Sequence, residues 1–264
     1  MPALSIVEGD ILQSPRLRRA MVHDTGLWPD GIVPYTTAAA QATFAATSPD
    51  AWPVARGRLA LAMAAFQMLT FVENATHPQL SITAAGPHCY AHIGRPTPGT
   101  VHALNLNVNS TACWEIGTVI HELGHAVGLY HEQSRPDRDV YLNVHSVTPQ
   151  SRLYRTLDRR NLPYDFASVM HYPLANIDAT LTPTGAARVA AQSMYYTIGH
   201  ASGLSPLDVR GLEALYGSHA TPGTTIAPAN HVLRWGIAGL ISLCILAAIA
   251  YAAYPRRPRD YTSL

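Results

Sequence analysis

Residues 121–132 read HELGHAVGLYHE, and this stretch determines how the rest of the chain is interpreted. His121 and His125 are four residues apart, so on a helix their imidazoles lie on one face and can reach the same metal ion. Glu122 follows next round that helix, where its carboxylate can hydrogen-bond a water on the ion without binding the ion itself. The spacing predicts a metal centre that activates water.

The surrounding residues predict both the helix and its end. Four apolar residues between positions 115 and 128 recur at helical spacing. Gly128 can adopt a left-handed backbone conformation that ends the helix and turns the chain back. His131 can then supply a third nitrogen to the same ion. The apolar residues at helical spacing are Ile116, Ile120, Leu123 and Val127.

The ligand set indicates zinc. Three neutral imidazole nitrogens at about 2.0–2.1 Å suit Zn²⁺ and leave a position open for water, as in catalytic sites. Such a site lowers the pKa of water to about 7 and polarises a peptide carbonyl, while Glu122 moves the proton to the leaving amine. A structural zinc domain is disfavoured because no cysteine is near this cluster. Unrelated surface histidines are disfavoured because Gly128 and His131 stand at the required offsets.

The amino-acid composition excludes some classes of function. The 264 residues are 48% hydrophobic, which fits one sizeable core with appendages. The formal net charge is only +1, so no global field favours nucleic acid, and nucleic-acid binding is set aside. Thirteen histidines are unusual for a chain of this length and agree with a histidine metal site.

Beyond the third histidine, the sequence resembles the astacin family of metzincin metalloendopeptidases, whose motif continues as HExxRxDRD. Residues 131–139 read HEQSRPDRD and match every fixed position. Residues 168–172 read SVMHY, which is similar to the methionine-bearing turn beneath the zinc in this family. The resemblance extends from LWPDGIVPY at residues 27–35 to IGHASGLS at residues 198–205 and LY at residues 215–216.

The resemblance implies an α+β fold of metzincin type. A twisted sheet and the active-site helix would lie above a cleft, and an irregular subdomain would lie below it. The implied activity is zinc-dependent endopeptidase cleavage of protein or peptide substrates. An extended substrate would pair with an edge strand, and the alternation HALNLNVN at residues 102–109 predicts a half-exposed strand that could be this edge.

Two further site residues follow from the same resemblance. Met170 would form the packing floor of the zinc site. Tyr172 would be a switchable zinc ligand that swings away to stabilise the oxyanion in the transition state; the alternative is an ordinary core aromatic. The rival interpretation is a membrane-anchored, catalytically inactive binding module on the same fold. The intact Glu122 and Tyr172 argue against it, because an inactive copy needs neither.

Residues 1–19 resemble the pro-segment of the family, in which the aspartate of an F-x-G-D motif binds the zinc and blocks the water. Here the motif reads VEGD and departs at its first position, so Asp10 is either the inhibitory ligand or an ordinary turn aspartate. Arginines at positions 16, 18 and 19 suit an activating trypsin-like protease. Cleavage would leave an amino terminus near Ala20, which the family buries against the glutamate after the third histidine, here Glu132.

The three cysteines bear on the compartment. Cys89 and Cys113 could form a disulfide or remain two thiols, while Cys244 lies alone in an apolar stretch. The resemblance implies that Cys89 and Cys113 are paired, which requires an oxidising, extracytoplasmic environment. The positions of a second family disulfide carry no cysteine, so the ends of the catalytic domain, residues 20–220, are expected to be looser than is usual in the family.

The C-terminal region predicts a membrane anchor. Residues 221–234 read as a linker, and residues 235–254 form an uncharged run rich in Ala, Ile and Leu that reaches the roughly 20 residues needed to span a bilayer. The basic tail 255–264 should face the cytoplasm, which makes the chain a single-pass membrane protein with an extracellular or lumenal catalytic domain. A buried core helix is disfavoured because the run has no polar face.

Translocation of the catalytic domain is not explained by the N-terminal sequence. Residues 1–19 contain no apolar core preceded by a basic region, so no secretory signal is recognisable there. Two explanations stay open: the hydrophobic run inserts as a tail anchor, or the true start lies upstream.

Overall fold

The computed structural model divides the chain into two compact units, residues 1–220 and residues 221–264. The predicted linker, transmembrane helix and basic tail lie outside the described residues, as do Ala20 and the arginines at 16, 18 and 19. None of the described helices is long and apolar enough to cross a membrane. The structure describes residues 5–7, 10–13, 26–74, 77, 79–145, 161–174, 181–185, 187–188, 191, 194 and 197–217.

A seven-stranded mixed sheet is the framework of the first unit, with the strand order β1-β2-β6-β7-β5-β3-β4. Strand β3 is parallel to β4 and β5, β5 is parallel to β7, and β6 is antiparallel to β7. The predicted pro-segment adds β2, parallel to β6, and β1, antiparallel to β2. The strands are β1 (Ser5–Val7), β2 (Ile11–Gln13), β3 (Ile32–Thr36), β4 (Thr70–Glu73), β5 (Leu80–Thr83), β6 (Tyr90–His92) and β7 (His102–Asn105).

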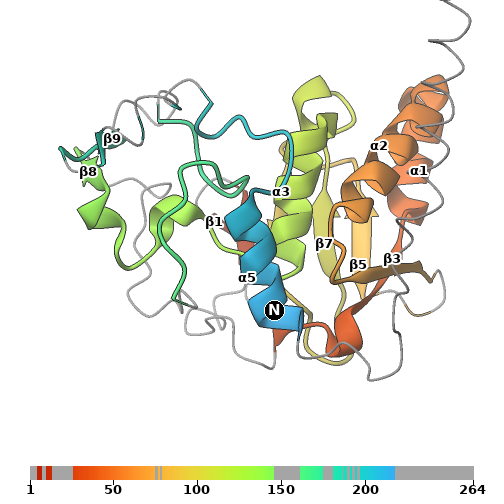
Figure 1. Cartoon of the computed structure of the whole chain (residues 1–264). Helices are drawn as coiled ribbons and strands as arrows, with labels where there is room; N and C mark the ends of the chain where they lie inside the picture. Colours follow the sequence, from red (N-terminus) through yellow and green to blue (C-terminus); the bar gives the residue numbers. More distant parts are fainter. Residues whose placement is uncertain are drawn as a thin grey trace, which may run out of the picture. The chain divides into compact units, whose positions relative to one another are not determined.

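Four α-helices accompany the sheet in the described part of the chain. Figure 1 shows α1 and α2 at one end of the unit, α3 in its middle and α5 beside α3. Helices α2 and α3 pack against each other, and α1 packs against β5. The helices are α1 (Ala38–Thr47), α2 (Trp52–Ala64), α3 (Ile116–Ala126) and α5 (Pro206–Tyr216); short 3-10 turns include η5 (Thr111–Trp114), η6 (Glu132–Ser134) and η7 (Arg138–Val140).

The main core fixes α3 against the sheet. Leu80 on β5, Leu104 on β7 and Leu123 on α3 are completely buried in the same hydrophobic cluster. Trp28 is also completely buried, and its indole Nε1 donates a hydrogen bond to the carbonyl of Ala126 at the end of α3 (2.8 Å). The helix that carries the predicted metal ligands is therefore held by packing on its other faces.

A capping box fixes the start of α5. The hydroxyl of Ser205 accepts hydrogen bonds from the backbone N–H groups of Leu207 and Asp208, and the Asp208 carboxylate accepts one from the Ser205 N–H. At the other end of α5, Tyr216 donates from its hydroxyl to the carbonyl of Val127 (2.7 Å). The last described helix is thereby tied to the residue that follows α3.

The part of the unit that follows His131, which we call the lower part, has a core of its own. Strands β8 (Leu142–Val144) and β9 (Leu181–Pro183) form a two-stranded antiparallel sheet, far from α1 and α2 in Figure 1. Most of the remaining described residues there are turns and extended segments. The α+β fold with an irregular lower part is confirmed. The buried residues of this second cluster are Leu142, Tyr164, Phe166, Leu174, Leu181, Ala187, Ala191 and Ile198.

The predicted edge strand at residues 102–109 is wrong in one respect. Residues 102–105 do form a strand, β7, but it lies between β5 and β6 in the interior of the sheet. Its polar side chains are buried because each has partners: His102 Nδ1 contacts the Gly94 carbonyl (2.8 Å), and Asn105 accepts from Thr83 and donates to the His88 carbonyl. The edge beside β7 is β6, and β2 of the predicted pro-segment covers it.

Candidate metal centre

The end of α3 brings the third histidine back to the first two. The helix stops at Ala126, and Gly128 has a φ of 105°, which an L-residue with a side chain rarely adopts. The N–H of Gly128 bonds to the carbonyl of His125, and the N–H of Leu129 to that of Gly124, so the helical carbonyls keep partners where the chain turns. The predicted helix and its glycine end are both confirmed.

Three imidazole nitrogens converge as a result. Nε2 of His131 lies 3.2 Å from Nε2 of His125 and 3.3 Å from Nε2 of His121. Nitrogens at tetrahedral positions around Zn²⁺ would be about 3.3 Å apart, given bonds of roughly 2.0–2.1 Å. The geometry therefore fits a zinc ion. His125 and His131 are completely inaccessible, and His121 is half-buried.

The outer nitrogens fix the tautomers that a metal requires. Nδ1 of His121 is 2.7 Å from the carbonyl of Val169, and Nδ1 of His125 is 2.8 Å from that of Leu129. A carbonyl only accepts, so each Nδ1 carries the hydrogen and each Nε2 presents its lone pair. Burial lowers the pKa of His125 to about 4, which keeps its imidazole neutral. Lone pairs directed at one point repel each other unless a cation lies between them.

Asp10 enters this centre from the pro-segment. Its Oδ2 is 3.2 Å from Nε2 of His121, and its Oδ1 is 3.1 Å from Nε2 of His131 and 3.7 Å from that of His125. Burial would raise the pKa of Asp10, but attraction to His131, and then close contacts with the imidazoles of all three histidines, hold it well below its usual value. The four side chains offer ligand atoms within 4.8 Å of one another. Asp10 therefore lies in the metal centre, as expected of the inhibitory ligand.

Glu122 lies beside the ligands with a free oxygen. The residue is 1% exposed, and its Oε2 has no hydrogen-bond partner among the described residues. Burial, and then the charge of Asp10, raises the pKa of its carboxyl well above the ordinary value. A buried carboxylate without a partner is costly, so its position calls for a ligand or a function.

The methionine turn lies under α3. Met170 is 2% exposed, and a Cβ added at Gly124 would lie only 2.6 Å from its sulfur, so this turn and the helix are in direct contact. Tyr172, two residues on, is half-buried and donates from its hydroxyl to Oδ2 of Asp10 (2.6 Å). Its ring also packs beside the ring of His131 at 4.4 Å. Tyr172 is thus a member of the centre and not a distant core aromatic.

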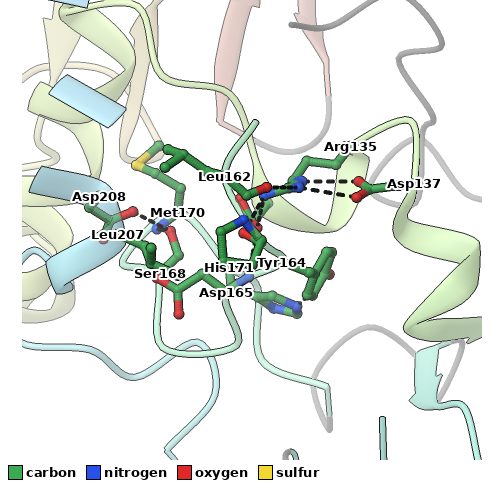
Figure 2. Close-up of polar contacts among 12 residues, drawn as sticks. Arg135, Asp137, Leu162, Tyr164, Asp165, Ser168, Met170, His171, Leu207 and Asp208 are labelled. Atoms are coloured by element: carbon green, nitrogen blue, oxygen red, sulfur yellow. Dashed lines mark hydrogen bonds and ion pairs between the residues drawn. The ribbon is translucent and has the colours of Figure 1, made fainter. Parts of the chain in front are cut away.

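Asp208 on α5 holds the methionine turn, and the sequence did not predict this. Its Oδ1 accepts from the hydroxyl of Ser168 (2.6 Å), and its Oδ2 accepts from the backbone N–H of Val169 (3.0 Å). Figure 2 shows Asp208 beside Ser168 and Met170. The Ser-x-x-Asp spacing at residues 205–208 is typical of a helix cap, but nothing local indicates the bond to a turn forty residues earlier.

Arg135 braces the segment after the third histidine. It makes a bidentate contact with Asp137 (3.1 Å each), and it donates to the carbonyls of Leu162 (2.8 Å) and Pro163 (2.9 Å), as Figure 2 shows for Asp137 and Leu162. It also pairs with Glu132 at 2.8 Å. Arg135 of the family motif therefore connects the segment after His131 to the residues that lead into the methionine turn.

Glu132 is already engaged in this arrangement. Its Oε1 accepts from Arg135 and from the backbone N–H of Asp165 (2.8 Å each). Burial raises the pKa of Glu132 to about 8, against the opposing effect of Arg135. Its predicted contact with a processed amino terminus near Ala20 involves a residue outside the described ranges.

A cavity of about 610 Å³ opens beside the metal centre. Asp10, His121, Glu122 and Tyr172 line one side of it. The start of α3, the methionine turn and the segment near residue 200 also line it, with Glu115, His171 and His200 as the additional ionisable residues. Among the described residues, this cavity lies next to the predicted metal ligands and has space for a peptide side chain.

Cys89, which lines this cavity, forms a disulfide bond with Cys113. The sulfur atoms are 2.07 Å apart and the Cα atoms 5.4 Å apart. The bond joins the loop before β6 to η5, directly ahead of α3. The pairing implied by the resemblance is therefore present, and the alternative of two thiols is excluded.

The fold and this site define a metallopeptidase of metzincin type. The model of the Astacin peptidase family matches residues 21–217, so the chain belongs to the astacin family, which is zinc-dependent. High choriolytic enzyme 1, a hatching-enzyme zinc protease from the medaka fish Oryzias latipes, has a similar structure, with a TM-score of 0.59 and 25% identity over 75% of this chain and 98% of that one.

Curated relatives agree with this assignment. Nematocyst expressed protein 6 from Nematostella vectensis is 28% identical over 86% of this chain and 82% of its own length. Zinc metalloproteinase nas-4 from Caenorhabditis elegans is 29% identical over 82% of this chain and 70% of its own length. Other relatives are longer: the chain spans 26% of Protein SpAN from Strongylocentrotus purpuratus and 40% of embryonic protein UVS.2 from Xenopus laevis.

Proposed function

We propose that this chain is a zinc-dependent endopeptidase that hydrolyses internal peptide bonds of proteins. The convergence of three Nε2 atoms, with neighbouring separations of 3.2 and 3.3 Å, is the observation that carries the proposal. The buried Oε2 of Glu122, which has no hydrogen-bond partner among the described residues, supports it against an inactive binding module. Burying such a group costs free energy, and a module that only binds gains nothing in return.

The side chains divide the reaction between them. His121, His125 and His131 would hold the zinc ion, which when bound would polarise the scissile carbonyl and lower the pKa of water. Glu122 is placed to take the proton from the attacking water and to deliver it to the leaving amine. Tyr172 would donate from its hydroxyl to the developing oxyanion once Asp10 no longer accepts from it. Met170 and Asp208 would position these groups without touching the substrate.

The intact chain is proposed to be latent. The carboxylate of Asp10 contacts the imidazoles and Tyr172, where it would take the place of the attacking water. Strand β2, directly after Asp10, also covers the edge of β6 that an extended substrate would pair with. A trypsin-like protease acting at the arginines 16, 18 and 19 would release both obstacles together.

The catalytic domain is proposed to lie outside the cytoplasm, anchored by a transmembrane helix at residues 235–254. The uncharged, apolar composition of this run supports the anchor, and the basic residues after it support the orientation. The disulfide between Cys89 and Cys113 supports the oxidising environment.

Proteolysis of an unfolded protein substrate tests the enzyme and its base together. The chain beginning at Ala20 should cleave it, a zinc chelator should abolish cleavage, and Zn²⁺ should restore it. Glu122→Gln should bind zinc to the same stoichiometry but be slower by about 10²–10⁴-fold. A folded, zinc-loaded chain with no activity would favour the inactive binding module.

A further inference from the structure

Two sequence triplets match the acceptor pattern for N-linked glycosylation, Asn-X-Ser/Thr with X other than proline. They are Asn74-Ala75-Thr76 and Asn109-Ser110-Thr111. Such triplets also occur by chance, so the structure has to decide between them. A glycan on a folded chain requires an exposed asparagine whose amide is not engaged with the protein.

Asn109 meets both conditions. It lies in a turn in which the N–H of Ser110 bonds to the carbonyl of Asn107 (3.1 Å) and the N–H of Asn109 bonds to Oδ1 of Asn107 (2.9 Å). Asn107 is in turn fixed by a bond from its Nδ2 to the carbonyl of Pro87 (2.8 Å). The side chain of Asn109 is exposed and has no hydrogen bond to any described residue, and Thr111 is exposed as well.

Asn74 is engaged instead. It is half-buried, and its Oδ1 accepts a hydrogen bond from the backbone N–H of His77 (2.9 Å). This bond, directly after β4, holds the half-buried side chain in a local turn, so Nδ2 is less accessible to a bulky glycan than an exposed amide would be. The two triplets therefore form a matched pair in one chain, one with an exposed asparagine and one with a half-buried asparagine held in a turn.

The neighbouring disulfide supplies the second observation. Cys113 is two residues after Thr111, and its N–H bonds to the carbonyl of Ser110 (3.2 Å), so the turn and the disulfide belong to one local structure. Because disulfides persist in oxidising compartments, the segment that carries Asn109 is suited to the lumen where glycosylation takes place. This step rests on the extracytoplasmic placement in the proposed function, but not on proteolytic activity.

We propose that Asn109 is the N-glycosylation site of this chain and that Asn74 is not modified. Nδ2 of Asn109 would attack the anomeric carbon of a lipid-linked oligosaccharide diphosphate. The C–N bond forms as the bond from that carbon to the phosphate oxygen breaks. The lipid diphosphate leaves with its electron pair, and Nδ2 loses one of its two protons to a base of the transferase. The glycan would project from the turn into solvent and would leave the hydrogen bonds of Asn107 intact.

The test uses the full chain behind a cleavable secretion signal in cultured animal cells. Protein is recovered from the membrane and secreted fractions, and only molecules with the Cys89–Cys113 disulfide formed are scored. Treatment with an amidase that removes N-glycans should increase gel mobility, and mass spectrometry should find Asn109 converted to Asp. Asn109→Gln and Thr111→Ala should each lose the whole mobility shift, whereas Asn74→Gln and Thr111→Ser should keep it.

Two results would overturn the assignment. One is a disulfide-bonded chain in which Asn109 is unmodified, since the disulfide shows that the segment reached an oxidising lumen. The other is a mobility shift that Asn74→Gln removes and Asn109→Gln leaves. Failure of proteolytic activity leaves the glycosylation result unaffected, because Glu122→Gln should be glycosylated like the unaltered chain.

Discussion

The hydroxyl of Tyr172 could exchange one hydrogen-bond acceptor, Asp10, for another, the oxyanion of the transition state. In this structure it donates to Asp10 at 2.6 Å. Tyr172→Phe keeps the ring that packs beside His131 and removes only the O–H. With the processed chain we expect kcat to fall by about 10²–10³-fold, the usual cost of one oxyanion donor, with KM little changed. Steady-state kinetics on a peptide substrate would measure it; a loss confined to KM would contradict the oxyanion role.

His102 makes the stability of the catalytic domain depend on pH. The residue is 8% exposed and stacks on His92 with ring centroids 4.4 Å apart. Burial, then the charge of His92, lowers its pKa to about 4, whereas an unfolded chain would have a value near 6.5. The unfolded state therefore binds more protons below about pH 6.5, so stability is full above that pH and is lost as the pH falls toward 4, by up to about 3 kcal/mol.

Urea unfolding at several pH values between about 7 and 4 would test this contribution of His102. The domain has other buried histidines, so the comparison must be with His102→Gln, whose amide can still donate to the carbonyl of Gly94. The variant should lose less stability over this interval than the unaltered domain. Equal losses in the two proteins would show that His102 is not the residue responsible.

At the scale of elements, the features that could be predicted are those that neighbouring residues in the sequence encode. Helix α3 could be predicted because its apolar period and Gly128 act within a few turns. The position of β7 could not, because buried polar residues with hydrogen-bond partners give the same alternation as exposed ones, and the partners come from distant segments. The link from Asp208 to the methionine turn was missed for the same reason.

Contact between α3 and the methionine turn is testable at one glycine. A Cβ at Gly124 would lie 2.6 Å from the sulfur of Met170, which is too close. Gly124→Ala should therefore cost about 1–3 kcal/mol by overpacking, and it should reduce kcat as the turn that carries Tyr172 shifts. Gly57→Ala in α2, where nothing lies within 4 Å of the new carbon, is the matched control and should stabilise by about 0.5–1 kcal/mol. Thermal unfolding and kinetics of both variants would separate the two effects.

At the scale of the whole molecule, the pro-segment and the catalytic domain share one sheet and one centre. The sequence placed Asp10 at the zinc site only through the family motif, because no local pattern links residue 10 to residues 121–131. The structure adds that β2 continues the sheet at β6, so the two contacts support each other. Removing the Asp10 carboxylate alone should therefore weaken the inhibition without detaching the strand.

Asp10→Ala in the uncleaved chain tests this arrangement. The hydroxyl of Tyr172 donates a charge-assisted hydrogen bond to Asp10, and such bonds contribute about 1.5–3 kcal/mol, so its loss should raise the activity of the uncleaved chain by about 10–10²-fold. Asp50→Ala, at an exposed aspartate, is the control and should stay as latent as the unaltered chain. If Asp10→Ala gains little activity and cleavage still raises it greatly, coverage of the β6 edge is the larger part of the inhibition. If the unaltered chain is fully active before cleavage, Asp10 is no inhibitor, and its place among the histidines would require another explanation.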